Sequence, residues 1–383
     1  MTMATGTSLS CDTALAAAAV LDCLDELAAL AEAPGAASGI VQHPHWLLYE
    51  LDSRGADATP HVVIARSPDG RIAGYAPFLL EQHTARVAFG TRQIAVYRGR
   101  VLRLLGSGVV ALPHAREAVE SAIAQALKSD TSATVMRIQE TVLPNTFAAQ
   151  LARAPGRFSS VQANLLDQLN WKIRPQGSVA AYLAALGAKR RNDLTRRLRN
   201  VYKKLGPHAS LRVFDAPGQI AEYGRLMNQV YARSWHAAVQ PIDWEQPARL
   251  AVFEQLAREQ QVIGHVMMLD ERPIAYVHGY RIGGSYLLDD TGYDEEFAAL
   301  GIGSALVFQS VQDLIERHPD ETIDFGYGDN QYKRLLADQQ TPCASLYIVR
   351  GLGPALRFRL IVPLRWLYRR GRAMVLRLRQ KKR

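Results

Sequence analysis

The chain has 383 residues, a hydrophobic fraction of 48% and a formal net charge of +9. This length exceeds one ordinary core, so two domains or two fused half-domains are expected, and no apolar run reaches the ~20 residues that cross a bilayer. Three cysteines (Cys11, Cys23 and Cys343) form neither a metal-binding spacing nor a disulfide framework, which excludes zinc sites and disulfide-stabilised secreted folds.

The positive charge is concentrated near the C-terminal end of the sequence. Residues 351–383 contain eleven Lys and Arg residues and no acidic residue. Removing these eleven from 45 leaves 34 basic residues against 36 acidic ones, so residues 1–350 are close to neutral. Basicity is therefore a property of a tail and not of the body of the protein.

The N-terminal region is rich in alanine and predicts an amphipathic helix from Asp12 to Glu32. No Lys or Arg precedes Arg54, so the positive n-region of a secretory signal is missing. Asp22 and Asp25 also interrupt the apolar run. We therefore expect a helix in a cytoplasmic protein.

The next part of the chain predicts a hairpin, further strands and a crossover helix. The turn Ser67-Pro68-Asp69-Gly70 separates two alternating apolar runs, which is typical of a β-hairpin. The predicted elements are strands at 61–66 and 71–78, short strands near Ala88 and Val101, a helix at 115–128 and a strand at 135–139.

The second half of the chain repeats this order of elements. The predicted elements are helices at 218–233 and 247–259, hairpin strands at 265–269 and 274–281, a strand at 285–290, a helix at 303–317 and a strand at 322–325. A hairpin, another strand, a crossover helix and a final strand thus occur twice. This indicates two copies of one mixed α/β unit, each a mixed sheet flanked by helices.

These patterns predict four segments with the following bounds. They are an N-terminal helix at 1–38, a first lobe at 39–180, a second lobe at 181–350 and a basic amphipathic tail at 351–383.

A cationic helix is predicted between the two copies, at residues 189–204. Leu194, Leu198 and Val201 share one apolar face, which leaves the other face to Lys and Arg side chains. This face is either simply solvated or lines a cleft that holds an anionic ligand, such as the phosphates of a substrate.

The stretch from Tyr293 to Lys333 carries the strongest chemical signal. The turn Gly301-Ile302-Gly303-Ser304 precedes a predicted helix, and backbone N–H groups at such a turn can hold a phosphate. A predicted strand then ends in Asp324-Phe325-Gly326-Tyr327-Gly328, followed by Asp329, Tyr332 and Lys333.

These motifs together resemble those of the CelD/Fem-like family of the GNAT acyltransferase superfamily. The residues that carry the resemblance are Asp324, Phe325, Gly328, Asp329, Tyr332 and Lys333, with the upstream phrase Lys189-Arg190-Arg191, Arg196-Arg197, the pair Ser234-Trp235 and the hairpin phrase at 269–275. The resemblance extends over residues 40–350 and is strongest from 180 to 340.

The resemblance implies two tandem GNAT-like lobes and the transfer of an acyl group to an amine or hydroxyl acceptor, in cell-envelope or polysaccharide biosynthesis. It implies acetyl-CoA or another acyl-CoA as donor, bound by Gly301, Ile302, Gly303 and Ser304, and no metal. Ala298 stands where the family usually has Arg or Gln. The implied substrate-binding residues are Arg190, Arg191, Trp235 and Asp329.

Acyl transfer needs a proton acceptor near the nucleophile and a proton donor for the leaving group. Asp290 is the first candidate for the base; Asp289 is its neighbour, and solvated turn carboxylates are the alternative interpretation. Tyr332 is a candidate acid, and Lys333 a point charge for an oxyanion or phosphate. His278 within an apolar strand is interpreted as structural.

The basic tail combines arginines with leucines, Trp366 and Tyr368, which suits an anionic membrane surface at the inner face of the membrane. A merely solvated charge run remains open, and nucleic acid is not an expected partner. Pro363 and Gly371 interrupt this amphipathic pattern. Two functional alternatives also remain: a Fem-like ligase that uses aminoacyl-tRNA, and a non-catalytic partner docked at the membrane. The acceptor is expected to be a small molecule or a saccharide.

Overall fold

The structure, a computed structural model, describes residues 9–37, 39–89, 92–153, 158–162, 168–238 and 242–380. The chain divides into two compact units, of which the first comprises residues 1–168 and 342–383 and the second residues 169–341. The chain therefore returns to the first unit after Thr341, whereas the sequence pattern placed residues up to 350 in the second lobe.

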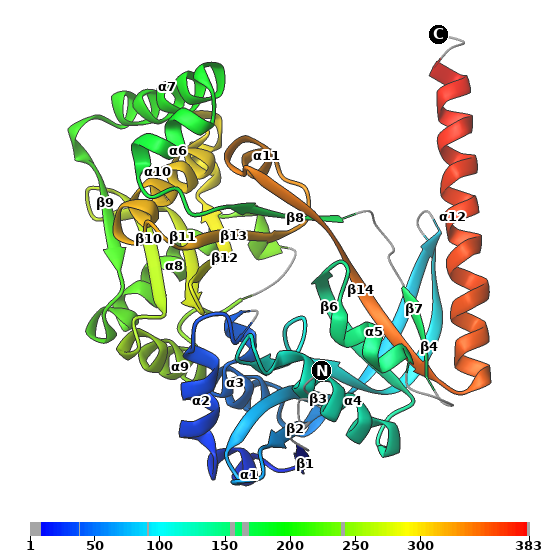
Figure 1. Ribbon diagram of the computed structural model, residues 1–383. Coiled ribbons are helices and arrows are strands. Elements are labelled where there is room, and N and C mark those ends of the chain that lie inside the picture. The colour runs from blue at the N-terminus through cyan, green and yellow to red at the C-terminus, as the bar shows by residue number, and fades with distance from the viewer. Residues whose placement is uncertain are drawn as a thin grey trace, which may run out of the picture. The chain divides into compact units, whose positions relative to one another are not determined.

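The first unit is built on a mixed sheet (Figure 1) with the strand order β1-β2-β3-β4-β6-β14. Strands β4 and β6 are parallel and the other neighbours antiparallel. Two further strands, β5 and β7, pair with β3 and β14. The bounds are β1 Ser10–Ala14, β2 Ala58–Arg66, β3 Ile72–Phe89, β4 Arg92–Leu104, β5 Val110–Ala111, β6 Val135–Val142, β7 Phe158–Gln162 and β14 Gln339–Arg350.

The helices of the first unit include the crossover helix between the parallel strands. This helix, α4, buries Val119, Ile123 and Leu127 at a spacing of four residues, so a single stripe packs on the sheet. The bounds are α1 Ala17–Leu21, α2 Leu24–Glu32, α3 Pro44–Arg54, α4 Arg116–Ser129, α5 Thr146–Arg153 and α12 Leu352–Gln380, with 3-10 turns η1 Ile40–Gln42 and η2 Gly55–Asp57.

Two local predictions for this unit are wrong. Residues 12–32 do not form one helix, because Ser10–Ala14 pairs with β2 as an edge strand before α1 and α2 begin. The short strands near Ala88 and Val101 are parts of the long strands β3 and β4, which pair along most of their length. The predicted hairpin is confirmed as β2 and β3.

The second unit repeats the same topology with the strand order β9-β10-β11-β12-β13-β8. Again the strands that flank the crossover helix, β12 and β13, are parallel, and the other neighbours are antiparallel. The bounds are β8 Gln168–Ile173, β9 Ala209–Phe214, β10 Val262–Leu269, β11 Arg272–Ile282, β12 Ser285–Tyr293 and β13 Thr322–Tyr327.

The last strand of each sheet comes from an unexpected part of the chain. Strand β8, which precedes every other strand of the second unit, pairs with β13. The corresponding partner of β6 in the first unit is β14, which follows the whole second unit. The two units are therefore built by exchanging their closing strands.

Helices cover both faces of the second sheet. On β11 the side chains alternate, so Ala275 and Val277 join the cluster under α10 while Tyr276 and His278 face the rings of Trp244 and Phe253. The bounds are α6 Val179–Ala185, α7 Ala188–Leu205, α8 Ile220–Tyr231, α9 Pro247–Arg258, α10 Ile302–Arg317 and α11 Gln331–Leu336, with 3-10 turns η3 Gly206–His208, η4 Pro217–Gln219, η5 Trp235–Ala238 and η6 Glu295–Leu300.

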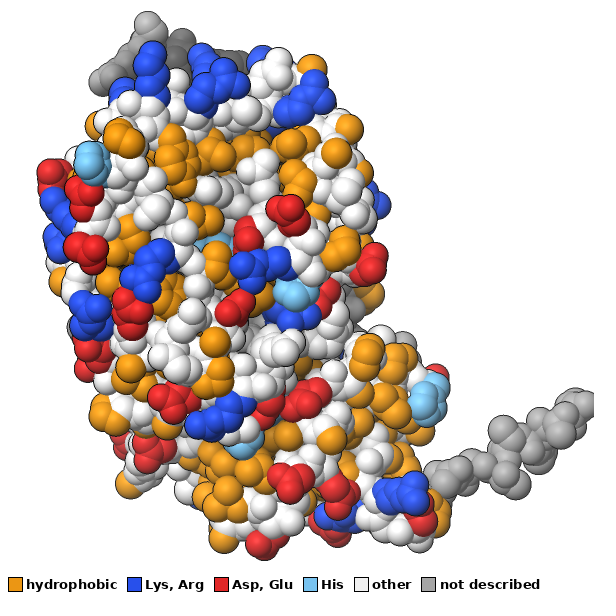
Figure 2. All heavy atoms as spheres, turned by 90° about the vertical axis from the view of Figure 1, so that its left-hand side faces the viewer, with side chains coloured by type: hydrophobic (Ala, Val, Ile, Leu, Met, Phe, Trp, Pro, Cys, Tyr) orange, Lys and Arg blue, Asp and Glu red, His pale blue; other side chains and the backbone are white. Residues whose placement is uncertain are grey.

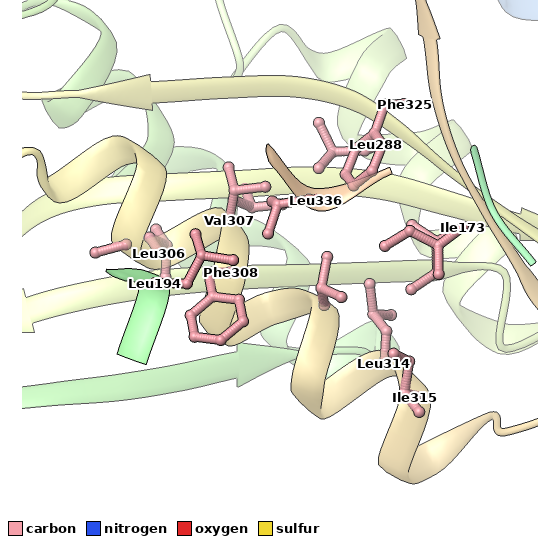
Figure 3. Packing of buried hydrophobic residues seen from close by; sticks show 14 of the residues in the cluster. Ile173, Leu194, Leu288, Leu306, Val307, Phe308, Leu314, Ile315, Phe325 and Leu336 are labelled. Atoms are coloured by element: carbon pink, nitrogen blue, oxygen red, sulfur yellow. The ribbon is translucent and has the colours of Figure 1, made fainter. Parts of the chain in front are cut away.

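Helix α10 is the central element of the core in the second unit. Figure 3 shows Leu306, Phe308 and Leu314 of this helix among residues from several other elements, including Leu194 of α7 and Ile173 of β8. All five side chains are at most 3% exposed, so this packing fixes the start of α10 relative to β12 and β13.

The C-terminal helix α12 runs without interruption from Leu352 to Gln380. Pro363 and Gly371, which interrupt the amphipathic pattern of the sequence, both lie within this helix. In the described part of the chain, no helix is long and apolar enough to cross a membrane.

Candidate functional site

The second sheet opens between its two parallel strands. Strands β12 and β13 pair only from Ser285–Thr322 to Leu287–Asp324. Strand β12 continues to Tyr293 along β11, and β13 bends away towards Tyr327. Beyond Leu287, β12 therefore has an edge that no strand in the described ranges covers. Such an edge can pair with an extended ligand.

The N-terminus of α10 faces the same end of β12. Gly301 is the N-cap, in the left-handed conformation with φ 69°, and offers no side chain to the helix. The first turn contains no acidic residue, and no side chain in the described part caps it, so the N–H groups of Ile302, Gly303 and Ser304 stay available for an anion. A Cβ at Gly303 would lie 2.7 Å from the Tyr293 ring, so glycine allows helix and strand to approach closely.

The turn η6 that joins β12 to α10 is held by a buried carboxylate. Asp294, 3% exposed, accepts from Arg233 Nε and Arg272 Nη2, each at 2.6 Å. Its other oxygen accepts from the backbone N–H of Glu296 at 3.1 Å. These bonds fix the backbone that leads to Gly301 and Gly303.

A β-bulge in β12 carries two adjacent carboxyl groups. His278 pairs with Asp290 and Gly279 pairs with Leu288, so Asp289 is the extra residue. The residue as a whole is exposed, whereas protein atoms crowd around its carboxyl group. Desolvation by these atoms and the negative charge of Asp290 raise the pKa of Asp289 to about 6. A group with this pKa can take up a proton near neutral pH.

Asp290 is half-buried and tied to a tyrosine. Its carboxylate accepts a hydrogen bond from Tyr276 Oη at 2.7 Å. Desolvation raises the pKa of Asp290, and this hydrogen bond partly opposes the rise. The Tyr276 ring crosses β12 at Gly292, where a Cβ would lie 2.5 Å from the ring. Glycine at this position therefore lets the phenol reach Asp290.

Tyr332 of α11 lies close enough to sense the charge of Asp290. Burial raises the pKa of Tyr332 to about 12; its bond with Asn330 opposes this shift and the charge of Asp290 adds to it. The phenol is therefore protonated at neutral pH and able to donate. Asp290 and Tyr332, which the sequence proposed as base and acid, therefore lie within electrostatic range of each other.

Lys333 is placed differently from an exposed point charge. It is 5% exposed, and its ammonium group donates to the Tyr327 carbonyl at 2.6 Å. This bond ties α11 to the end of β13, two residues before Asp329. Asp329 is exposed and forms an ion pair with Arg334.

The predicted cations lie on α7, next to a surface hollow of about 940 Å³. Arg190 lines this hollow together with Lys189 and Arg196, whereas Arg191 is not among its lining residues. Figure 2 shows Lys and Arg side chains gathered at the top of this face, where α7 lies. A neighbouring gap, which shares Leu335 with the hollow, is lined by Ser304 and Tyr332.

Trp235 projects from the turn η5 with 50% of its surface exposed, and its ring lies 3.8 Å from that of His236. His236 in turn lowers the pKa of Asp290, so it lies on the side of that carboxylate. His278 is fully buried, its Nδ1 is 3.0 Å from Tyr223 Oη, and burial lowers its pKa to about 3. The structural interpretation of His278 agrees with this environment.

Sequence reasoning missed Tyr276 and His236. Tyr276 lies two residues before His278 on the same face of β11, and the Gly292 that makes room for it lies two residues after Asp290. This pairing could have been found only with the strand register in hand. The position of His236, directly after Trp235, gave no separate signal.

Residues 188–334 match the family described as acetyltransferase (GNAT) domain. No curated protein sequence matches the chain. Among solved structures, FemX is similar over 88% of this chain and 98% of its own, with a TM-score of 0.60 and 11% identity.

Two further structures are similar at comparable levels. The C-terminal domain of a putative lysylphosphatidylglycerol synthetase from Agrobacterium fabrum has a TM-score of 0.54 and 10% identity, covering 88% of this chain and 95% of its own. L-PGS from Bacillus licheniformis has a TM-score of 0.52 and 13% identity, covering 89% and 95%. These likenesses show a shared fold, and the predicted architecture of two tandem GNAT-like lobes is confirmed.

Proposed function

Because the second unit carries a GNAT-type acetyltransferase domain, we propose that the protein transfers an acyl group from acyl-CoA to an amine or hydroxyl acceptor. The observation that carries this proposal is the uncovered edge of β12 beside the N-terminus of α10. An acyl-CoA has two parts that suit these two features, an amide-containing arm and a pyrophosphate.

The donor would bind with its arm extended along β12. Amides of the arm pair with backbone groups of the strand beyond Leu287, as a peptide does when it adds to a sheet edge. The pyrophosphate accepts from the N–H groups of Ile302, Gly303 and Ser304, and the helix dipole favours its charge. The thioester then lies near the bulge of β12.

The residues of the bulge and of α11 would carry out the proton transfers. The acceptor attacks the thioester carbonyl, and Asp289, with Asp290 beside it, takes the proton from the attacking nitrogen or oxygen. The tetrahedral intermediate collapses by breaking the C–S bond. Tyr332, a protonated phenol, gives a proton to the leaving thiolate. Asp290 acts on Asp289 as a positioning residue through its charge.

The acceptor would approach from the side of η5. The exposed indole of Trp235 is an apolar, flat surface of the kind that stacks on sugar rings or acyl chains. This placement supports a saccharide or other small acceptor, with cell-envelope or polysaccharide biosynthesis as its setting.

A charge placed in the first turn of α10 tests the donor site. Ser304→Asp should lower the affinity for coenzyme A by at least about tenfold, because its carboxylate lies where the pyrophosphate would bind. The same change should stabilise the helix by about 0.5 kcal/mol, since an acid at a helix start favours the dipole. Calorimetric titration and thermal unfolding measure the two effects.

Ser304→Asn is the matched neutral control and should retain binding. If the wild type binds neither acetyl-CoA, longer acyl-CoAs nor free coenzyme A, the acyl-CoA donor is wrong, and the non-catalytic alternative gains support. If binding occurs and Ser304→Asp leaves it unchanged, the pyrophosphate lies elsewhere.

A second candidate donor is aminoacyl-tRNA, which the cations beside the hollow on α7 favour. Asp193 pairs with Arg196 and Arg197, but in the described part of the chain no acidic group lies within ion-pair distance of Lys189 or Arg190. These two side chains could therefore contact phosphates of an acceptor stem.

Replacing Lys189 and Arg190 by Gln discriminates the two donors. With aminoacyl-tRNA as donor, the slope of log affinity against log salt should fall by about one for each phosphate that the variant no longer neutralises. Arg258→Gln, an exposed change on α9, is the control. Unchanged transfer from acyl-CoA together with absent tRNA binding would remove this candidate.

A further inference from the structure

Among the side chains of helix α12 that the structure describes, those that pack on the first unit lie on one face. Ala355 and Phe358 are buried, and the ring of Phe358 lies 5.3 Å from that of Tyr347 on β14. Ile361 packs against the same cluster, and the ring of Tyr368 lies 5.6 Å from that of Phe89 on β3. This face holds the helix in place and accounts for its buried side chains.

The opposite face carries a row of exposed apolar side chains, termed here the leucine stripe. Its members are Leu352, Leu356, Leu360, Leu364, Leu367 and Met374, each at least 55% exposed. At about 100° per residue they fall within an arc of about 120°, and at about 1.5 Å per residue the stripe is about 33 Å long. Exposed apolar patches of this continuity mark interaction surfaces.

Arginines border the stripe on both sides. Arg357 and Arg359 are exposed and lie on either side of the arc, and residues 351–383 contain eleven basic residues and no acidic one. The surface that covers the stripe must therefore be apolar in the middle and negatively charged at its rim. An anionic lipid leaflet has both properties.

Other occupants fit this combination less well. A second copy of the chain would bring two sets of eleven cations together, and their repulsion opposes association. A nucleic acid would neutralise the cations but leave the leucines exposed to water. The arginines along the helix also exclude a membrane-spanning position, in agreement with the hydropathy of the described helices.

We propose that α12 binds anionic membranes by lying in the lipid interface, with the leucine stripe inserted among the acyl chains and the arginines at the phosphates. The helix thus docks the first unit on a membrane surface. This docking is independent of the chemistry of the second unit.

Co-sedimentation of the full-length protein with vesicles tests the proposal. The protein should sediment with vesicles that contain phosphatidylglycerol and remain in the supernatant with vesicles of phosphatidylcholine alone. The double variant Leu356→Glu/Leu360→Glu should lower the partition coefficient at least about tenfold, because carboxylates replace apolar groups at the interface. Arg357→Gln and Arg359→Gln should each lower it about fivefold.

Ile94→Glu is the matched control, since Ile94 is an exposed apolar residue of the same unit outside the stripe, at 47% exposure. Circular dichroism of each variant checks that the fold is kept. We expect the variants to fold because the substituted side chains are exposed. Equal sedimentation of wild type and stripe variants, or no sedimentation with anionic vesicles, overturns the proposal. A wild-type dimer that the stripe variants convert to monomer also overturns it, in favour of a second copy.

Discussion

Asp289→Asn should lower kcat/KM for acyl transfer by about 100-fold or more, the loss expected when a positioned general base is removed. Asn matches the carboxylate in shape but accepts no proton at neutral pH. The wild-type rate should rise with pH and level off above about 6, because the pKa of Asp289 is raised to about 6 and only its ionised form acts. The variant should lack this rise.

Asp290→Asn separates positioning from proton transfer. Removing the negative charge of Asp290 lowers the pKa of Asp289, so the rise in kcat/KM should move to lower pH. Asp320→Asn, an exposed change in the same unit, should leave the profile intact. If Asp290→Asn abolishes the rise while Asp289→Asn keeps it, Asp290 is the base, as the sequence first suggested.

Gly279→Ala should lower the free energy of unfolding by about 3 kcal/mol, the upper end of the range for overpacking a buried site. A Cβ at Gly279 would lie 2.4 Å from the Leu287 carbonyl oxygen and 2.4 Å from the Tyr286 ring. The carbonyl is backbone and cannot turn aside, so the strands at the bulge must move. Asp289 would then be displaced, and activity should fall with stability.

Chemical denaturation measures this effect, with Gly218→Ala as the matched control. No atom lies within 4 Å of a Cβ at Gly218, so its unfolding free energy should change by no more than about 0.5 kcal/mol. Equal stability of the two variants would show that the bulge tolerates a side chain and does not depend on glycine.

Local sequence signals predicted much of each sheet. The hairpins β2–β3 and β10–β11 have turn residues between alternating strands, and both were found with the expected partners. The closing strands β8 and β14 were not predicted, because pairing between distant residues leaves no trace in local periodicity. The edge strand β1 was missed for a similar reason. Its pairing with β2 decides its conformation, although the alanine-rich residues that follow it favour a helix.

The candidate site was predicted in part. The glycine turn at Gly301 and Gly303 could be identified because a helix start of this type has a recognisable pattern. The tie between Tyr276 and Asp290 depends on strand register, and the burial of Lys333 depends on tertiary packing. Neither could be deduced from residue spacing alone.

The exchange of closing strands also sets the order in which the chain can fold during synthesis. Strand β6 obtains its partner β14 only after Leu346 has left the ribosome, about 200 residues after Ile138, with which it pairs. At about 5–20 residues per second this delay is about 10–40 s. By the end of this delay the second unit already has every strand it needs, because β13 ends at Tyr327, whereas the first unit has shown an open sheet edge throughout. The unit that emerges first is therefore the last to be completed, and the open edge of β6 is where mispairing during synthesis is expected.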